Sequence, residues 1–297
     1  MKILLLGKNG QVGWELQRAL APLGEVIALD RHGANGLCGD LTDLSGLRQT
    51  IRSVQPDVLV NAAAYTAVDK AESEPGLADL INAQAPQVMA EEIHKLNGWL
   101  VHYSTDYVFD GSGNQPWVEG DLSTPLNQYG MSKLRGEQAI QTNGCQHLIL
   151  RTSWVYAARG GNFAKTMLRL AAEREQLNVI ADQLGAPTGA ELIADCTVHA
   201  LRCAIDKPQV SGVYHLAAAG EVSWHGYASY VIEQARAAGA QLAVQQINVI
   251  PTSDYPTPAL RPLNSRLDCR KLRDTFSLHL PDWQSGVSRM LNETQGH

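Results

Sequence analysis

The stretch Lys2-Ile3-Leu4-Leu5-Leu6-Gly7-Lys8-Asn9-Gly10-Gln11-Val12-Gly13 decides the fold. An apolar run leads directly into a loop in which glycine recurs at every third position, and helix-forming residues follow. Glycine has no Cβ, so this loop can approach a pyrophosphate closely, and the next helix offers free N–H groups and the positive end of its dipole. The pattern predicts a strand-loop-helix unit that binds a dinucleotide. Its predicted contacts are Gly7, Asn9, Gly10, Gln11, Val12 and Gly13.

A second apolar run, Val26–Leu29, ends at Asp30, 20 residues beyond Gly10. A carboxylate at this place hydrogen-bonds the 2′-hydroxyl of an adenosine ribose, which favours NAD. The neighbouring Arg31 can pair with a 2′-phosphate, so the two residues together predict use of either NADH or NADPH. Asp40 and Leu41 fall where a contact with the adenine edge is expected, although an aspartate in a loop is also a common turn former.

Short apolar runs alternate with helix-length segments along the first two thirds of the chain. This order predicts βαβ units and therefore an α/β fold, a Rossmann-type doubly wound parallel sheet with helices on both faces. The expected strands are Ile3–Leu6, Val26–Leu29, Val58–Asn61, Leu100–Ser104, Leu148–Arg151 and Val213–Leu216. The expected helices are Val12–Leu20, Leu44–Val54, Glu74–Lys95, Gln128–Thr142 and Glu191–Ile205.

The pattern loosens from about Gly160 onward. Phe163–Arg174 is typical of a helix and Val179–Ala181 of a strand, whereas the four prolines within Pro251–Pro262 predict a loop. We interpret these segments as a smaller substrate-binding cap, interleaved with the dinucleotide-binding domain. The predicted division assigns residues 1–155 and 185–217 to the dinucleotide-binding domain and residues 156–184 and 218–297 to the cap.

The composition excludes several classes of protein. The 297 residues include 24 Lys and Arg against 30 Asp and Glu, so no basic field is present to attract nucleic acid. The five cysteines form no C-x-x-C pair, which argues against a disulfide framework or a zinc site. The opening apolar run is too short for a signal peptide, and no run of about 18 apolar residues predicts a membrane span. We expect a cytoplasmic enzyme or binding protein.

Tyr129 and Lys133 are four residues apart on a predicted helix, so one helix face carries both. A tyrosine pKa near 10 suits acid–base work at neutral pH poorly, and a nearby cation favours the phenolate. Thr105 ends the fourth predicted strand, at the sheet edge where α/β proteins bind ligands. There its hydroxyl can orient a carbonyl or alcohol for hydride transfer. Such tyrosine–lysine pairs also occur on solvated helices, but the glycine loop and Thr105 favour the catalytic interpretation.

Together these residues resemble the extended short-chain dehydrogenases/reductases, and within them the family of reductases that act on dTDP-4-dehydro-L-rhamnose. The resemblance covers the full chain and rests on the Gly7 loop, Tyr129 with Lys133, and four segments: Asn61–Glu72, His102–Gly111, Arg151–Tyr156 and Gly185–Gly189. It implies that NADPH or NADH reduces the C4 ketone of this nucleotide sugar to dTDP-L-rhamnose, used for cell-surface polysaccharide such as the O-antigen of lipopolysaccharide. Tyr129 would donate the proton, Lys133 would hold the nicotinamide ribose and lower the tyrosine pKa, and Thr105 would orient the ketone.

The resemblance also implies further binding residues. Ala62, Ala63 and Tyr65 would form a wall along the cofactor, and the substrate contacts would be Thr66, Val68, Thr105, Asp106, Tyr107, Tyr129, Trp154 and Arg261. An indole at Trp154 can pack on the apolar face of a 6-deoxy sugar, but a tryptophan at a domain junction is also a common core residue. Arg261 can clamp a diphosphate, although a solvated loop arginine is the other interpretation.

A metal site is a further implication of the resemblance. Glu15, Glu191 and Glu293 would bind Mg²⁺ at the interface of a homodimer, since carboxylates suit a hard cation. Without the family, all three are typical exposed residues.

Two other functions stay open. A nucleotide-sugar 4-epimerase would use the same tyrosine and lysine, whereas a 4,6-dehydratase is disfavoured because Tyr107 stands where its carboxylate is needed. A non-catalytic, nucleotide-binding regulatory subunit, like that of methionine adenosyltransferase, has the same fold and need not keep proton-transfer groups. The presence of Thr105, Tyr129 and Lys133 favours the reductase.

Overall fold

A parallel sheet of six strands forms the centre of the molecule, in a computed structural model that describes residues 1–295. Its strands are β1 (Lys2–Leu6), β2 (Glu25–Leu29), β3 (Val58–Asn61), β4 (Trp99–Thr105), β5 (Gln146–Thr152) and β10 (Gly212–His215). They lie in the order β10-β5-β4-β3-β1-β2, and every neighbouring pair is parallel. From β1, the chain adds β2 on one side and then β3, β4, β5 and β10 on the other, so the strand order switches between β1 and β3. Doubly wound folds bind ligands at such a switch point. The predicted fold class is confirmed, with strand ends that differ by one or two residues.

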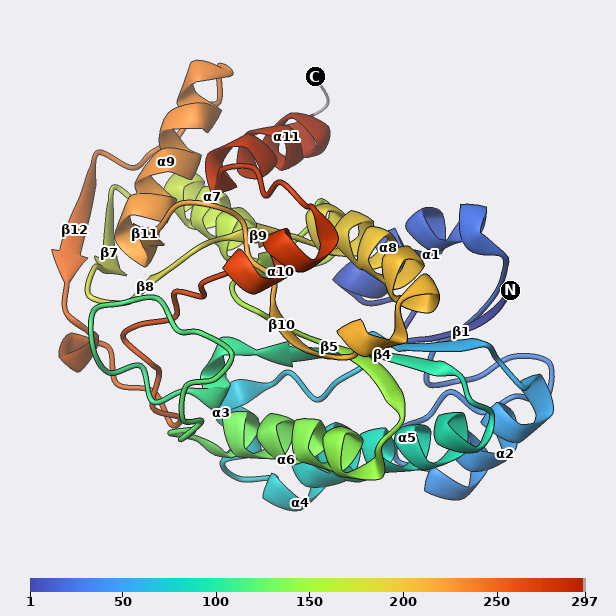
Figure 1. The fold of residues 1–297 in the computed structure, drawn as a ribbon. Coiled ribbons are helices and arrows are strands. Elements are labelled where there is room, and N and C mark those ends of the chain that lie inside the picture. Colours follow the sequence, from blue (N-terminus) through green and yellow to red (C-terminus); the bar gives the residue numbers. More distant parts are fainter. Residues whose placement is uncertain (296–297) are drawn as a thin grey trace.

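Helices cover both faces of the sheet (Figure 1). One face packs on α1 (Gln11–Leu20), α8 (Ala190–Asp206) and α10 (Arg270–Phe276), and the other on α2 (Leu44–Val54), α5 (Ala85–Lys95) and α6 (Gln128–Asn143). In β1, Ile3 and Leu5 are buried under the first set, and Leu4 and Leu6 under the second. The strand is apolar throughout because both of its faces are covered.

The helix expected over Glu74–Lys95 is interrupted. It consists of α4 (Pro75–Asp79), a π-helical turn (Leu80–Gln84) and α5. Within the turn the buried Asn82 accepts a hydrogen bond from Tyr65 N at 2.8 Å and donates to Tyr65 O at 3.0 Å and to Ser132 Oγ at 3.0 Å. The turn therefore fixes the loop after β3 against α6. Between that loop and α4 lies the short helix α3 (Val68–Ala71).

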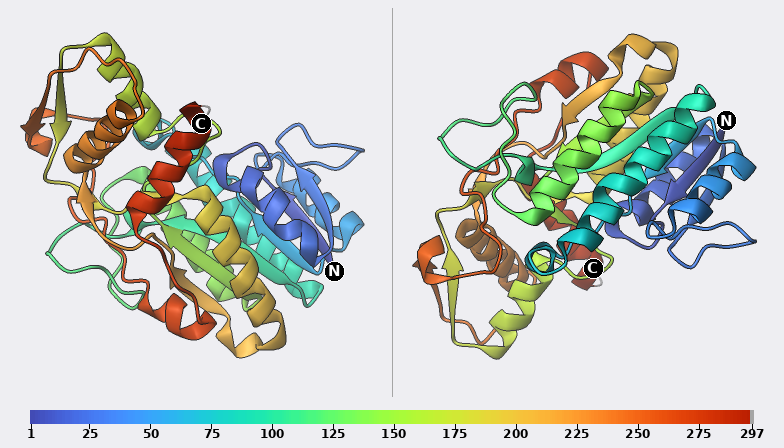
Figure 2. Two further views of the ribbon diagram at one scale, coloured as in Figure 1. Left: turned by 90° about the horizontal axis from the view of Figure 1, so that it is seen from above. Right: turned by 90° about the horizontal axis from the view of Figure 1, so that it is seen from below.

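The cap lies at one end of the sheet (Figure 2). It contains α7 (Phe163–Glu173), α9 (Trp224–Ala237), α11 (Trp283–Gln295), and a parallel pair, β7 (Gln176–Ile180) with β12 (Gln246–Ile250). Two further short pairs tie it to the sheet: β6 (Val155–Tyr156) with β9 (Thr188–Gly189), and β8 (Leu184–Gly185) with β11 (Val222–Ser223). The proline-rich segment is a loop apart from one 3-10 turn at Thr252–Asp254, as predicted.

The helices of residues 1–295 include none that is both long and apolar enough to span a lipid bilayer.

Candidate active site

A cleft of about 850 Å³ opens at the carboxyl ends of the strands, between the sheet and the cap. It is lined by the ends of β1 to β5 and, from the cap, by Trp224 of α9. Most of the predicted site residues meet here: Gly7, Asn9, Gly10, Gln11, Val12, Asp30, Arg31, Ala62, Ala63, Thr66, Val68, Thr105, Asp106, Tyr107, Tyr129, Lys133 and Trp154. Residues far apart in the sequence therefore share one cavity.

The glycine loop has the conformation that a close approach requires. Gly7 has a φ of +86°, and a Cβ there would lie 2.7 Å from Ala63 N. Gly13 does not line the cleft; a Cβ on it would lie 2.1 Å from Gly7 O, so it lets α1 pack against the loop. The first turn of α1 follows at once, and its N–H groups have no partners within the helix. This arrangement fits a pyrophosphate.

Asp30 occupies the end of β2, and its carboxylate is held by three donors. Asn9 Nδ2 donates at 2.8 Å and His32 N at 2.9 Å, while Lys8 Nζ lies 3.7 Å away. The bond from His32 N and the Lys8 charge keep the pKa of Asp30 below its ordinary value. Arg31 is beside it on the cleft. Lys8 and His32 are additional basic side chains at the expected adenosine end that the sequence argument missed, although Lys8 lies within the glycine loop.

The phenol of Tyr129 points into a dense group of side chains. Its ring meets that of Tyr107 edge to face, with centroids 5.8 Å apart, and Thr105 lines the same cleft. Burial raises the pKa of Tyr129 to about 12, while the nearby Thr105 hydroxyl acts in the opposite direction. The phenol is therefore protonated at neutral pH, as a proton donor requires.

Lys133 is only 2% exposed and lies at the base of the cleft. Its Nζ donates to Tyr103 O at 2.5 Å and lies 3.2 Å from Nε2 of His102. Burial lowers the pKa of Lys133 to about 8, while Glu137 raises it. We expected Lys133 to lower the tyrosine pKa. In the structure its amine contacts the strand β4, and its effect on the pKa of Tyr129 stays a prediction.

Several buried polar atoms of the cleft have no hydrogen-bond partner among the described residues. They are Ser104 Oγ, Asp106 Oδ2, Thr152 Oγ1 and Ser153 Oγ. Burial raises the pKa of Asp106 to about 7, although the hydrogen bond from the Thr105 hydroxyl, at 3.1 Å, acts in the opposite direction. Unpartnered polar atoms in a cleft are ready to bind a polar ligand. Thr152 and Ser153 were missed as site residues, although Thr152 ends β5 and Ser153 follows it at the ligand-binding edge.

Trp154 forms one wall of the cleft. It has a φ of +49°, which is rare for a bulky residue, and its ring stacks on Trp224 with centroids 3.5 Å apart. A Cβ on Gly185 would lie 2.7 Å from the Trp154 ring, so glycine makes room for the indole. The indole thus contributes both to the cap core and to the cleft wall. Nothing in the sequence pairs it with Trp224, which is 70 residues away.

Three expected cofactor contacts lie elsewhere. Asp40 Oδ1 accepts from Thr42 N and Oγ1 at 2.9 and 2.8 Å and forms a turn, and Leu41 is a core residue. The Tyr65 hydroxyl donates to Glu74 at 2.6 Å, outside the cleft lining. Turn formation, packing and a hydrogen bond account for these side chains.

Arg261 also differs from its expected position. Its guanidinium forms a bidentate ion pair with Asp69, with Nη1 and Nη2 at 3.0 and 2.8 Å from the carboxylate, and it does not line the cleft. It ties the proline-rich loop of the cap to α3. A clamp on a diphosphate would require this pair to open.

The three glutamates expected to bind Mg²⁺ are neighbours, but they form no ligand set. Burial and the charge of Glu293 raise the pKa of Glu191, and Glu15 adds to the effect. Each carboxylate pairs with an arginine: Glu15 with Arg18, and the other two with Arg289. Among the described residues, no three His, Cys, Asp or Glu side chains are placed to hold a metal ion. The residues of one chain alone do not fit Mg²⁺.

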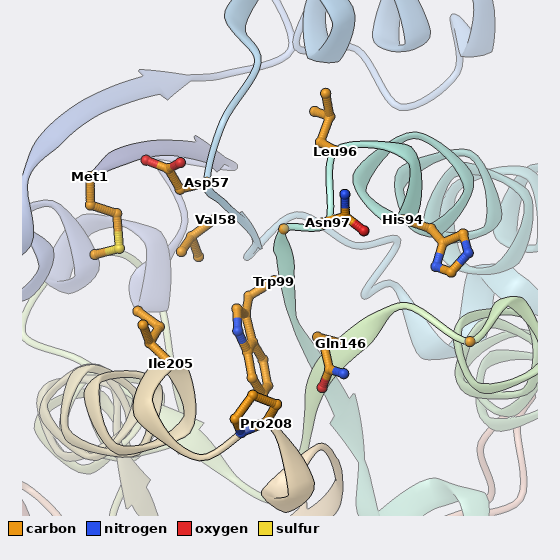
Figure 3. A pocket seen from close by; sticks show the side chains of 12 residues that line it. Met1, Asp57, Val58, His94, Leu96, Asn97, Trp99, Gln146, Ile205 and Pro208 are labelled. Atoms are coloured by element: carbon orange, nitrogen blue, oxygen red, sulfur yellow. The ribbon is translucent and has the colours of Figure 1, made fainter.

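A second cavity, of about 660 Å³, lies at the opposite edge of the sheet (Figure 3). Val58, Trp99 and Gln146, the first residues of β3, β4 and β5, line it together with Met1. The amino ends of parallel strands are not where α/β folds bind ligands. The first cleft is therefore the candidate active site.

Comparisons with known proteins identify the family of this chain. The family described as "RmlD substrate binding domain" matches residues 1–295. The chain is 60% identical to the dTDP-4-dehydrorhamnose reductase of Shigella flexneri, over 99% of this chain and 98% of that protein. A crystal structure of the reductase from Clostridium acetobutylicum has a TM-score of 0.89 at 32% identity and covers 99% and 100% of the two chains. That from Bacillus anthracis, in complex with NADP, has a TM-score of 0.87 at 33% identity and covers 99% of each. The chain belongs to the family of the dTDP-4-dehydrorhamnose reductases.

Proposed function

We propose that this chain is an NAD(P)H-dependent oxidoreductase that reduces the C4 ketone of dTDP-4-dehydro-L-rhamnose to dTDP-L-rhamnose. The observation that carries the proposal is a single cleft that brings the protonated Tyr129 together with Thr105 and Lys133 and continues to the glycine loop. Relatives that share up to 60% of the sequence over nearly the full chain carry the name of this activity. The product is a precursor for cell-surface polysaccharide.

Each residue then has a chemical task. When bound, the reduced nicotinamide supplies the hydride. Tyr129 gives its phenolic proton to the ketone oxygen, and Thr105 orients that oxygen and stabilises the phenolate that is left. Lys133 lies on the same helix face and binds the ribose next to the nicotinamide. Tyr107 occupies the position where elimination would need a carboxylate, so the site favours reduction.

The other contacts follow the cleft. Gly7 and the first turn of α1 hold the pyrophosphate, and Asp30 with Arg31 at the end of β2 binds the adenosine ribose. Thr66, Val68 and Trp154 line the sugar side, where the indole can pack on the methyl group of a 6-deoxy sugar. Since an acidic and several basic side chains lie together at Asp30, we expect both NADH and NADPH to serve.

The test is loss of 340 nm absorbance when the protein and NADPH, then NADH, meet dTDP-4-dehydro-L-rhamnose made in situ by a 3,5-epimerase. Omitting the epimerase is the substrate control. Tyr129→Phe should bind NADPH but lose reduction, whereas Tyr214→Phe, which removes a hydroxyl bonded to Val210 O outside the cleft, should keep it. A folded protein that binds NADPH without oxidising it would instead indicate a 4-epimerase or a regulatory subunit.

We also propose a cytoplasmic homodimer in which residues 1–155 and 185–217 bind the cofactor and residues 156–184 and 218–297 the sugar. The partly buried Glu191, beside a cavity of about 250 Å³ between α8 and α11, supports a subunit contact there. Mg²⁺ has no part in the chemistry proposed above. Light scattering with and without a chelator tests the assembly: a monomer would refute the dimer, and a chelator-independent dimer would refute the metal bridge.

A further inference from the structure

His102 lies beneath the active site, in a chain of polar side chains that the reaction does not use directly. It is on β4, opposite Asn61 of β3, and only 1% exposed. Its Nδ1 is 3.1 Å from Asn61 Nδ2, and its Nε2 is 3.2 Å from Lys133 Nζ. Both ring nitrogens therefore face groups that carry N–H donors.

The imidazole is neutral. Burial, and then the charge of Lys133, lower the pKa of His102 well below its ordinary value. A neutral imidazole has one N–H and one acceptor nitrogen, so the neighbours decide which nitrogen holds the proton.

A backbone donor fixes that choice. Ala63 N donates to Asn61 Oδ1 at 3.2 Å, so the other atom of the amide, Nδ2, faces His102. An amide NH₂ can only donate, and Nδ1 of His102 must accept. The imidazole proton therefore lies on Nε2, the nitrogen that faces Lys133.

An N–H group that faces Lys133 distinguishes its two forms. An ammonium offers only donors, so it repels the N–H of His102, whereas a neutral amine accepts from it and still donates to Tyr103 O. Among the charged groups near the amine, Glu137 on α6 favours the ammonium, but its carboxylate is shared with Arg151 of β5.

We propose that His102 is a positioning residue for the reduction proposed above: fixed by Asn61 as the Nε2–H tautomer, it favours the neutral amine of Lys133. His102 therefore sets the pH at which Lys133 changes from ammonium to amine, and with it the upper end of the pH range in which the reduction runs. Burial already lowers the pKa of Lys133 to about 8, and His102 would act in the same direction. His102 touches neither sugar nor cofactor and acts only through Lys133.

The tautomer can be measured directly in the wild-type protein. In ¹⁵N-histidine-labelled protein, long-range ¹H–¹⁵N spectra assigned by through-bond experiments should show His102 neutral and protonated on Nε2 from pH 6 to 9. An Nδ1–H tautomer, or an imidazolium in this range, would overturn the proposal. This readout does not depend on activity, so it stands even if the proposed reaction fails.

A variant tests the effect on Lys133. Gln in place of His102 can turn its carbonyl oxygen toward the amine and so favour the ammonium. The ammonium stabilises the phenolate of Tyr129, so kcat/KM should fall with rising pH as Lys133 loses its proton. In His102→Gln this fall should move to higher pH by about one unit, a tenfold change in the acid dissociation constant.

The matched control is His215→Gln, which replaces a second fully buried, neutral histidine, on β10 and outside the cleft. It should leave the pH profile in place. Circular dichroism and NADPH binding confirm that both variants fold. The same profile in His102→Gln and the wild type would show that His102 only fills space.

Discussion

Glu137→Gln would remove the charge of one partner in the buried ion pair beneath the site. Glu137 is fully buried and the Arg151 side chain is 5% exposed; Arg151 Nε and Nη2 lie 2.9 and 2.6 Å from the two carboxylate oxygens. Breaking a buried pair from one side costs roughly 3–5 kcal/mol, because the remaining charge stays buried without compensation. We expect Glu137→Gln to lower the free energy of unfolding by about this amount, measured by urea denaturation followed by tryptophan fluorescence.

Two controls make the result specific. Glu173→Gln breaks a pair with Arg169 whose side chains are 54% and 61% exposed, and it should cost less than about 1 kcal/mol. The double variant Glu137→Gln/Arg151→Met removes both charges and should recover much of the lost stability. Equal losses in Glu137→Gln and Glu173→Gln would refute the reasoning. Since Glu137 also raises the pKa of Lys133, its loss should lower that pKa further.

Gly13→Ala should weaken NADPH binding at least tenfold in a fluorescence titration, because its Cβ would lie 2.1 Å from the carbonyl oxygen of Gly7. The control Gly76→Ala, which has open space around it, should leave NADPH binding unchanged. Hydrogen bonds from Arg52, and then from Lys95 and Arg48, lower the pKa of Glu92 to about 2. The ionised carboxylate of Glu92 therefore stabilises the fold fully above pH ~4.5, and this stabilisation is lost as the pH falls toward 2. In urea unfolding, Glu92→Gln should be ~2–3 kcal/mol less stable than the wild type at pH 7, and the difference between the two should be smaller at pH 3. Arg261→Ala breaks a partly exposed ion pair with Asp69 and should raise the substrate KM by up to about fivefold, leaving the NADPH KM unchanged; an unchanged substrate KM would remove it from the site.

The sheet could be predicted because its strands are buried on both faces. Such strands are continuous apolar runs, and all six were located to within two residues. The cap was predicted less completely. Its strand β12, Gln246–Ile250, alternates polar and apolar residues and pairs with β7, about 70 residues earlier, so no local signal identifies the partner.

In the candidate site, too, some residues could be predicted from the sequence and others could not. Residues that end a strand or follow it, such as Asp30 and Thr105, could be placed because parallel strands bring their carboxyl ends to one edge. Contacts across long separations could not. Arg261 meets Asp69 across 192 positions, and Trp154 meets Trp224 through a stacking contact that no spacing predicts.

The π-helical turn at Leu80–Gln84 limits how this protein can change. A π turn contains one residue more per turn than an α-helix, so deleting one residue there would restore regular helix geometry. Such a deletion would leave the flanking helices in register, because the π turn is what accommodates the extra residue, but it would withdraw Asn82 from Tyr65 and Ser132. The loop beside the cofactor and the helix that carries the proton donor would then lose their common support. A one-residue deletion in this helix should therefore not be tolerated, in natural variants or in engineered ones, unless a second change restores the lost amide.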